Sequence, residues 1–232
     1  MGALTDALVK GAAGAAQRSM DINSLCQGRT EEQQKVIKYF FDSSSKLTDS
    51  EYDSLVQAKL QSLNLKEHAM EKLGIDETQV NEIEPVHLEG YYFAADDLDA
   101  KKQAIYKKTG KDFYTRTSAY QQTWLFFSNE QIFAYQYTFN LDEEGYKETT
   151  EEYFYKDVVD FSLTDEAVEY KTTEPATGCG CFNKPKIKFE TFKETRFTIR
   201  LPGSSFGCAY YSSEYADDAV KGMRAKLREK KL

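Results

Sequence analysis

Three cysteines are the first candidates for a chemical role. Cys179 and Cys181 flank a single glycine in a Pro- and Gly-rich loop over residues 175–185, and Cys208 follows on a later predicted strand. Three thiolates and a fourth donor would satisfy zinc, and a closely spaced dithiol could carry redox chemistry. Structural zinc sites usually supply two ligand pairs with C-x-x-C spacing, which is not found here. We therefore expect no cofactor, and keep zinc at Cys179, Cys181 and Cys208 as the alternative to a hairpin tip with incidental thiols.

A second motif is Gly203-Ser204-Ser205-Phe206-Gly207, which has the G-x-S-x-G pattern of a hydrolase nucleophile elbow with Ser205 as the nucleophile. Such an elbow joins a strand to a helix and requires a histidine later in the chain. Here the segment joins two predicted strands, and the two histidines, His68 and His87, both precede it. The motif is interpreted as a hairpin loop. No catalytic residue is expected, and the protein is predicted not to be an enzyme.

The charge balance excludes one large class of function. The 232 residues include 30 Lys and Arg against 38 Asp and Glu, a net charge of −8. Nucleic-acid binding needs a basic surface, so we expect no nucleic-acid partner. There is neither an apolar run of about 18 residues nor a secretory signal, which predicts a cytoplasmic protein with reduced thiols.

Aromatic residues divide the chain into two parts. Residues 1–90 contain four of them, and residues 91–232 contain the other 28. The first part also carries 9 basic and 15 acidic residues, whereas the second carries 21 and 23. This division predicts a helical region over 1–90, a charged linker over 91–112 and a β-rich domain over 113–232.

Three helices are predicted in the first part, over residues 3–18, 30–41 and 48–74. Thr48-Asp49-Ser50-Glu51 is a capping box, and Asn64-Leu65-Lys66-Glu67 repeats its pattern. Gly74 is suited to a left-handed C-terminal cap. The apolar stripes of these helices must be buried, either in a small bundle or against the following domain.

The second part alternates aromatic and β-branched residues between turn signals, which is typical of antiparallel strands. Strands are predicted near 113–120, 123–128, 131–140, 146–155, 158–163, 167–172 with a partner at 187–200, and 207–212. The chain then continues into an amphipathic helix from Ser213 to Lys230 with a basic last turn.

Three segments resemble a known family: Trp124 to Ile132, Glu152 to Phe161, and Phe197 to Gly203. They are similar to the recurrent strand pattern of bacterial pleckstrin-homology-like proteins, a largely uncharacterised group, over about residues 113–232. The resemblance implies an α+β fold in which a helical N-terminal region precedes a seven-stranded antiparallel barrel with a C-terminal helix. It implies a binding or assembly module and not an activity.

Pleckstrin-homology domains that bind inositol phosphates use Lys and Arg at the loop that joins the first two strands. Here Lys111 and Arg116 precede that loop, and Gln121-Gln122 lies in it. Phosphoinositide recognition is therefore not expected. We expect a non-enzymatic module that binds another protein or itself. A peripheral membrane adaptor with weak membrane contact, or a thiol or zinc protein using the Cys179/Cys181 loop, are the alternatives.

Overall fold

The structure is a computed structural model that describes residues 22–42, 44–93, 105–174 and 186–231. Four helices come first: α2 (Ile22–Cys26), α3 (Glu31–Phe41), α4 (Asp49–Leu63) and α5 (Leu65–Leu73). Capping boxes at Thr30 and Thr48 begin α3 and α4, and Gly74 ends α5 with φ 66°. The second capping box predicted at Asn64 is wrong, because Asn64 adopts φ 45° and its side chain makes no capping bond.

The central element is a four-stranded antiparallel sheet with the order β1-β4-β5-β6. Its strands are β1 (Ile83–Tyr91), β4 (Ala119–Phe127), β5 (Gln131–Asn140) and β6 (Tyr146–Phe154). The β4–β5 hairpin turns at Ser128, whose hydroxyl accepts from the backbone N–H of Gln131. The predicted strand over 131–140 is confirmed.

Two smaller sheets complete the fold. β2 (Lys107–Thr109) pairs with β3 (Thr115–Thr117), and β7 (Asp160–Glu174), β8 (Lys186–Leu201) and β9 (Ser204–Ala209) form a three-stranded antiparallel sheet. The chain then enters α6 (Glu214–Lys230), which Ser213 caps through the backbone N–H of Ala216. This confirms the predicted C-terminal helix.

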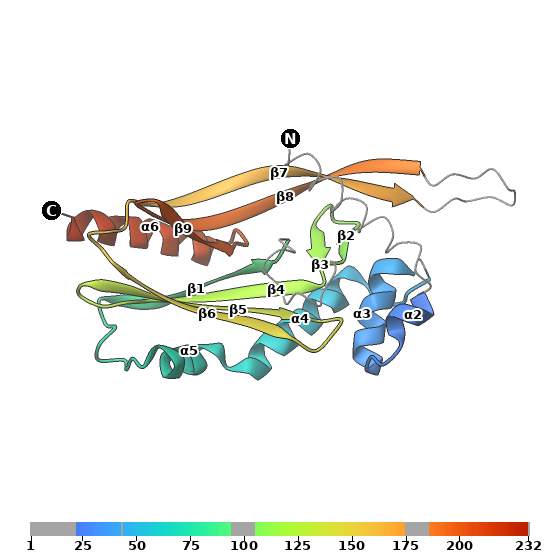
Figure 1. The fold of residues 1–232 in the computed structure, drawn as a ribbon, viewed down its shortest axis with the longest axis horizontal. Helices are drawn as coiled ribbons and strands as arrows, with labels where there is room; N and C mark the ends of the chain where they lie inside the picture. The colour runs from blue at the N-terminus through green and yellow to red at the C-terminus, as the bar shows by residue number, and fades with distance from the viewer. Residues whose placement is uncertain (1–21, 43, 94–104, 175–185, 232) are drawn as a thin grey trace, which may run out of the picture.

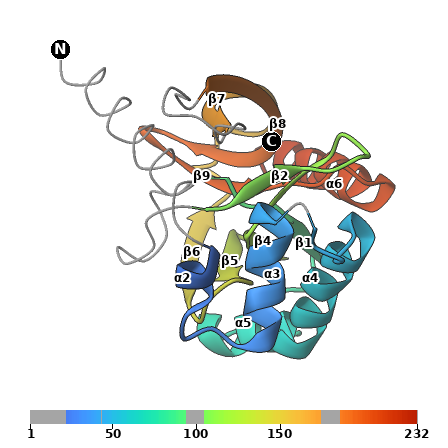
Figure 2. The same ribbon diagram turned by 90° about the vertical axis from the view of Figure 1, so that its right-hand side faces the viewer.

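The elements stack in layers (Figures 1 and 2). Two large hydrophobic clusters contain the buried side chains of these layers. Alternate residues of the central sheet face opposite sides. Phe126 and Tyr135 belong to the cluster that includes α3, α4 and α5. Leu125 and Ala134 belong to the cluster that includes α6 and the β7-β8-β9 sheet. Both faces of the central sheet are thus covered, which explains why β4 and β5 are almost continuously buried.

The predicted seven-stranded barrel is wrong. Within the described residues the strands form three separate antiparallel sheets, and none closes into a barrel. After β6 the chain turns through Tyr155–Val159, so that β6 and β7 are edges of different sheets. At the other edge, Tyr211 donates one backbone hydrogen bond of 2.7 Å to Glu89 without forming a ladder.

The helical N-terminal region is also corrected. Residues 83–91 form β1, which pairs with β4 along the central sheet. The helix predicted over 3–18 lies outside the described residues. The break predicted between strands at Gln121-Gln122 is absent as well, because both glutamines lie within β4 and are buried.

Candidate binding site

Arg116 on β3 is the centre of a charged network between the β2–β3 hairpin and α4. Its guanidinium donates to both carboxylate oxygens of Asp53 at 2.7 Å each, and to those of Asp112 at 3.0 and 2.8 Å. Only 4% of the Arg116 side chain is exposed, against 41% for Asp53 and 51% for Asp112. The hydrogen bonds to Asp53, followed by those to Asp112, raise the pKa of Arg116 despite its burial.

This network reaches two tyrosines. The Tyr91 hydroxyl donates to Asp53 Oδ1 at 2.6 Å, and the Tyr39 hydroxyl donates to Asp49 Oδ1 at 2.8 Å. Burial raises the pKa of both hydroxyls, and it is followed by Asp49 for Tyr39 and by Tyr52 and Asp53 for Tyr91, so both hydroxyls stay protonated donors at neutral pH. Tyr91 is consequently held in one position by a carboxylate that Arg116 itself fixes.

Gly110 lets the hairpin approach this network closely. A Cβ atom built on Gly110 would lie 2.6 Å from Arg116 Nη1, from Asp112 Oδ1 and from Asp49 Oδ2. Such distances are shorter than any van der Waals contact, so a side chain at this position would displace the charged groups. Asp49 also accepts from the backbone N–H of Lys111 at 3.0 Å, which fastens the turn to the start of α4.

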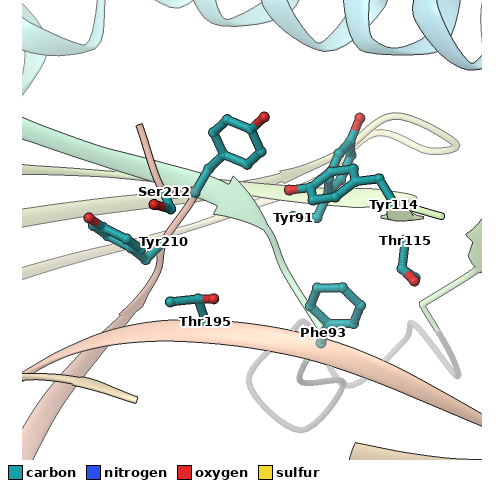
Figure 3. Close-up of a pocket in the computed structure, with 8 residues that line it drawn as sticks. Tyr91, Phe93, Tyr114, Thr115, Thr195, Tyr210 and Ser212 are labelled. Atoms are coloured by element: carbon teal, nitrogen blue, oxygen red, sulfur yellow. The ribbon is translucent and has the colours of Figure 1, made fainter. Parts of the chain in front are cut away.

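A cavity of about 170 Å³ opens beside the network (Figure 3). Aromatic rings and hydroxyl groups surround it, from the end of β1, the β2–β3 hairpin, β8 and the segment after β9. The lining residues are Tyr91, Phe93, Tyr114, Thr115, Thr195, Tyr210, Tyr211 and Ser212. We call this cavity the tyrosine pocket.

The rings of the tyrosine pocket are fixed by one another and by Asp217. Tyr114 meets Tyr211 edge to face, with centroids 5.5 Å apart, and lies 5.9 Å from Tyr91. The Tyr210 hydroxyl donates to Asp217 Oδ1 at 2.5 Å. Burial, with help from this hydrogen bond, raises the pKa of Tyr210.

The chemistry of the tyrosine pocket follows from its lining. Its eight residues bear rings and hydroxyl groups, and none bears a carboxylate, imidazole, thiol or amine. Acid–base catalysis needs a group that exchanges a proton near neutral pH within hydrogen-bond reach of the substrate. Burial raises the pKa of Tyr91, Tyr114 and Tyr210, which moves these hydroxyls away from that range. The lining is suited to holding a ligand.

The chain matches no protein-family model, no curated protein and no solved structure with which it was compared. The resemblance to pleckstrin-homology-like proteins is therefore neither supported nor refuted by relatives, and it stays a prediction.

Of the three predicted zinc ligands, the structure describes Cys208. Cys208 is fully buried on β9, where burial raises its pKa to about 12, so it is a protonated thiol at neutral pH. Cys179 and Cys181 lie outside the described residues. Among the residues described, no three His, Cys, Asp or Glu side chains are grouped as metal ligands.

Ser205 and the histidines lie in unrelated places. Ser205 is exposed within β9, paired with Arg200 across the sheet, and not at a strand-to-helix turn. His68 Nε2 lies 2.8 Å from Glu148 Oε1, which also accepts from the Tyr135 hydroxyl. His87 packs between the rings of Trp124 and Tyr215, with both centroids 4.9 Å away. This supports the interpretation of the G-x-S-x-G segment as a hairpin.

Basic residues considered for anionic ligands are largely engaged within the protein. Arg116 is buried and bound by Asp53 and Asp112. Gln121 and Gln122, which were expected in the loop after the first strand, lie within β4. On α6, both Lys226 and Lys230 pair with Glu82, at 2.5 and 3.5 Å. None of the helices in the described ranges is long and apolar enough to cross a membrane. The membrane-adaptor alternative gains no support from these contacts.

Sequence reasoning missed the four tyrosines of the pocket. Three of them belong to the pairs Tyr91-Tyr92 and Tyr210-Tyr211, at the ends of β1 and β9. Adjacent residues of a strand face opposite sides, so a tyrosine pair there must direct one ring away from the core side. That signal could have indicated an aromatic surface.

Asp112 predicts an acid-dependent loss of stability. Hydrogen bonds from Arg116 lower its pKa from the ordinary 3.8 to about 2. The unfolded chain therefore binds a proton at higher pH than the folded chain does, so the stabilisation is complete above pH 3.8 and is lost as the pH falls towards 2. Asp112→Asn should lower the urea midpoint at neutral pH and leave it unchanged near pH 2.

Asp218→Asn is the control for that measurement, because Asp218 forms an exposed pair with Lys221 and should change the midpoint little at either pH. An Asp112→Asn variant whose deficit is the same at both pH values would contradict the assignment.

Proposed function

We propose that the protein is a non-enzymatic binding module and that its tyrosine pocket holds one aromatic side chain of a protein partner. The observation that carries the proposal is the size and lining of the pocket. Its 170 Å³ is well below the roughly 300–1,000 Å³ of small-molecule sites. An apolar cavity of about 150 Å³ accommodates a benzene molecule, so the volume fits a single ring.

The walls of the pocket are already positioned for a ligand. Tyr91 is held by Asp53, and Tyr210 by Asp217, through hydrogen bonds of 2.6 and 2.5 Å. Side chains that are already fixed in the free protein lose little conformational entropy when a ligand binds. Tyr114 and Tyr211 already meet edge to face, and a bound ring that packs on either of them would form a further aromatic pair of the favoured kind.

The test uses N-acetyl-phenylalaninamide, a neutral capped side chain, as the probe in saturation-transfer NMR with the full chain. Tyr211 is 52% exposed, so Tyr211→Ala removes a wall without opening the core. We expect the probe to bind, and this variant to weaken binding by roughly 2- to 10-fold, because an aromatic contact contributes about 0.5–1.5 kcal/mol.

Tyr215→Ala is the matched control, since Tyr215 is 49% exposed and does not line the pocket. It should bind the probe like the unaltered protein. Binding that is absent, or that both variants weaken equally, would count against the tyrosine pocket as the site.

A further inference from the structure

Phe113 is an aromatic side chain that the fold holds in solvent. It is 91% exposed, at the tip of the β2–β3 hairpin, and its φ is 62°. A bulky residue rarely adopts this left-handed conformation, which glycine or asparagine would occupy at lower cost. Its ring therefore contributes little burial and its backbone is strained, so folding alone does not account for a phenylalanine at this position.

The turn that carries Phe113 is fastened on both sides. The backbone N–H of Phe113 donates to Gly110, and that of Lys111 donates to Asp49. Asp112, directly before Phe113, is bound by the guanidinium of Arg116. The ring therefore projects from a rigid point. We call residues 110–114 the Phe113 tip.

The Phe113 tip and the tyrosine pocket are complementary in charge. The tip presents Lys111, which is exposed, and its own Asp112 is paired with Arg116. Near Thr195, Tyr210 and Ser212 the pocket is bordered by acidic residues, since Asp165 accepts from Thr195 and Asp217 accepts from both Tyr210 and Ser212. Near Phe93 the border is basic, because Lys107 Nζ lies 5.6 Å from the centroid of that ring. Lys111 of an approaching tip is attracted to the side of the border that carries Asp165 and Asp217, which orients the tip over the pocket.

We propose that a second copy of this chain supplies the aromatic side chain, and that each protomer inserts Phe113 into the tyrosine pocket of the other. The inference rests on the proposed function of the pocket. Tyr114 lines the pocket and directly follows Phe113, so donor ring and acceptor pocket are neighbours on one surface. When two such surfaces are related by a two-fold axis, each pocket receives the Phe113 ring of the other protomer. No ring or pocket is left over, so the assembly is closed as a dimer.

The test is sedimentation velocity of the full chain over a dilution series. We expect a concentration-dependent dimer that Phe113→Gly weakens by at least roughly 30-fold, as for a central aromatic anchor. Glycine suits φ 62°, so this variant should fold, with an unchanged or higher melting temperature. Phe154→Ala, at an exposed phenylalanine of β6, is the matched control and should still dimerise.

Complementation distinguishes the exchange from a general loss of association. Ser212→Trp places a large ring at the exposed border of the pocket and should abolish both dimerisation and binding of N-acetyl-phenylalaninamide. Mixing Phe113→Gly with Ser212→Trp leaves one ring and one free pocket, so a heterodimer should form although each variant alone is monomeric. A dimer would occupy its own pockets, so the probe is also tested on Phe113→Gly, whose pocket is free. A monomeric unaltered protein that binds the probe would overturn the second-copy inference alone, whereas failure of the probe to bind Phe113→Gly would overturn the proposed function.

Discussion

Replacing Arg116 by alanine is expected to lower the free energy of unfolding by roughly 3 kcal/mol, the lower end of the range for breaking a buried ion pair. The variant removes four charge-assisted hydrogen bonds that join β3, the hairpin turn and α4. Asp53 and Asp112 are half-exposed and regain water when the guanidinium is removed, which keeps the cost from being larger. The change in the free energy of unfolding is measured by urea unfolding monitored by far-ultraviolet circular dichroism.

Two further variants sharpen this result. Arg116→Lys keeps the charge but cannot form two forked pairs at once, so it should recover only part of the lost stability. Arg228→Ala, on the exposed face of α6, should change the free energy of unfolding by less than about 0.5 kcal/mol. A loss of less than about 1 kcal/mol for Arg116→Ala would show that the network contributes no more than a surface ion pair does.

The helices were predictable because their signals are local. Thr30 and Thr48 each bond to a backbone N–H three residues later, so the caps are visible in four consecutive residues. The strand over 131–140 was predictable because alternation of large residues is equally local. Local signals were right at Thr30, Thr48 and Gly74, whereas the local pattern at Asn64 was misleading, because Asn64 adopts φ 45° and its side chain makes no capping bond.

The other errors concern contacts between residues far apart in the chain. Gln121-Gln122 has the composition of a loop, yet Gln121 is satisfied within the core by Thr138 and by the backbone N–H of Ala209, 88 residues away. Whether sheets close into a barrel depends on pairing between distant edges in the same way. The partner of Arg116 on α4 is Asp53, 63 residues earlier, so no local pattern could show that this arginine is a structural centre.

Tyr52 joins the helical layer to the hairpin that carries the site. It is fully buried, stacks on Tyr39 with centroids 4.5 Å apart and lies 6.1 Å from Tyr91. Its hydroxyl donates to the backbone oxygen of Thr117 at 2.7 Å. The same side chain thus combines ring packing between α3 and α4 with one hydrogen bond to β3.

Tyr52→Ala is expected to lower the free energy of unfolding by roughly 4 kcal/mol, because a large buried ring leaves a cavity that rigid neighbours cannot fill. Tyr52→Phe keeps the ring and removes only the donor to Thr117, so its cost should be about 1–2 kcal/mol. Urea unfolding measures both, and Tyr146→Ala, at a tyrosine of β6 that is 63% exposed, is the control with a small effect.

Binding separates the two contributions of Tyr52. The ring behind Tyr91 remains in Tyr52→Phe, so N-acetyl-phenylalaninamide should bind this variant as it binds the unaltered protein. If Tyr52→Phe destabilised the protein as much as Tyr52→Ala, the hydrogen bond to Thr117 would be the main contribution of this residue. Equal stability of Tyr52→Phe and the unaltered protein would assign the whole effect to packing of the ring, because a satisfied buried hydroxyl normally contributes about 1 kcal/mol.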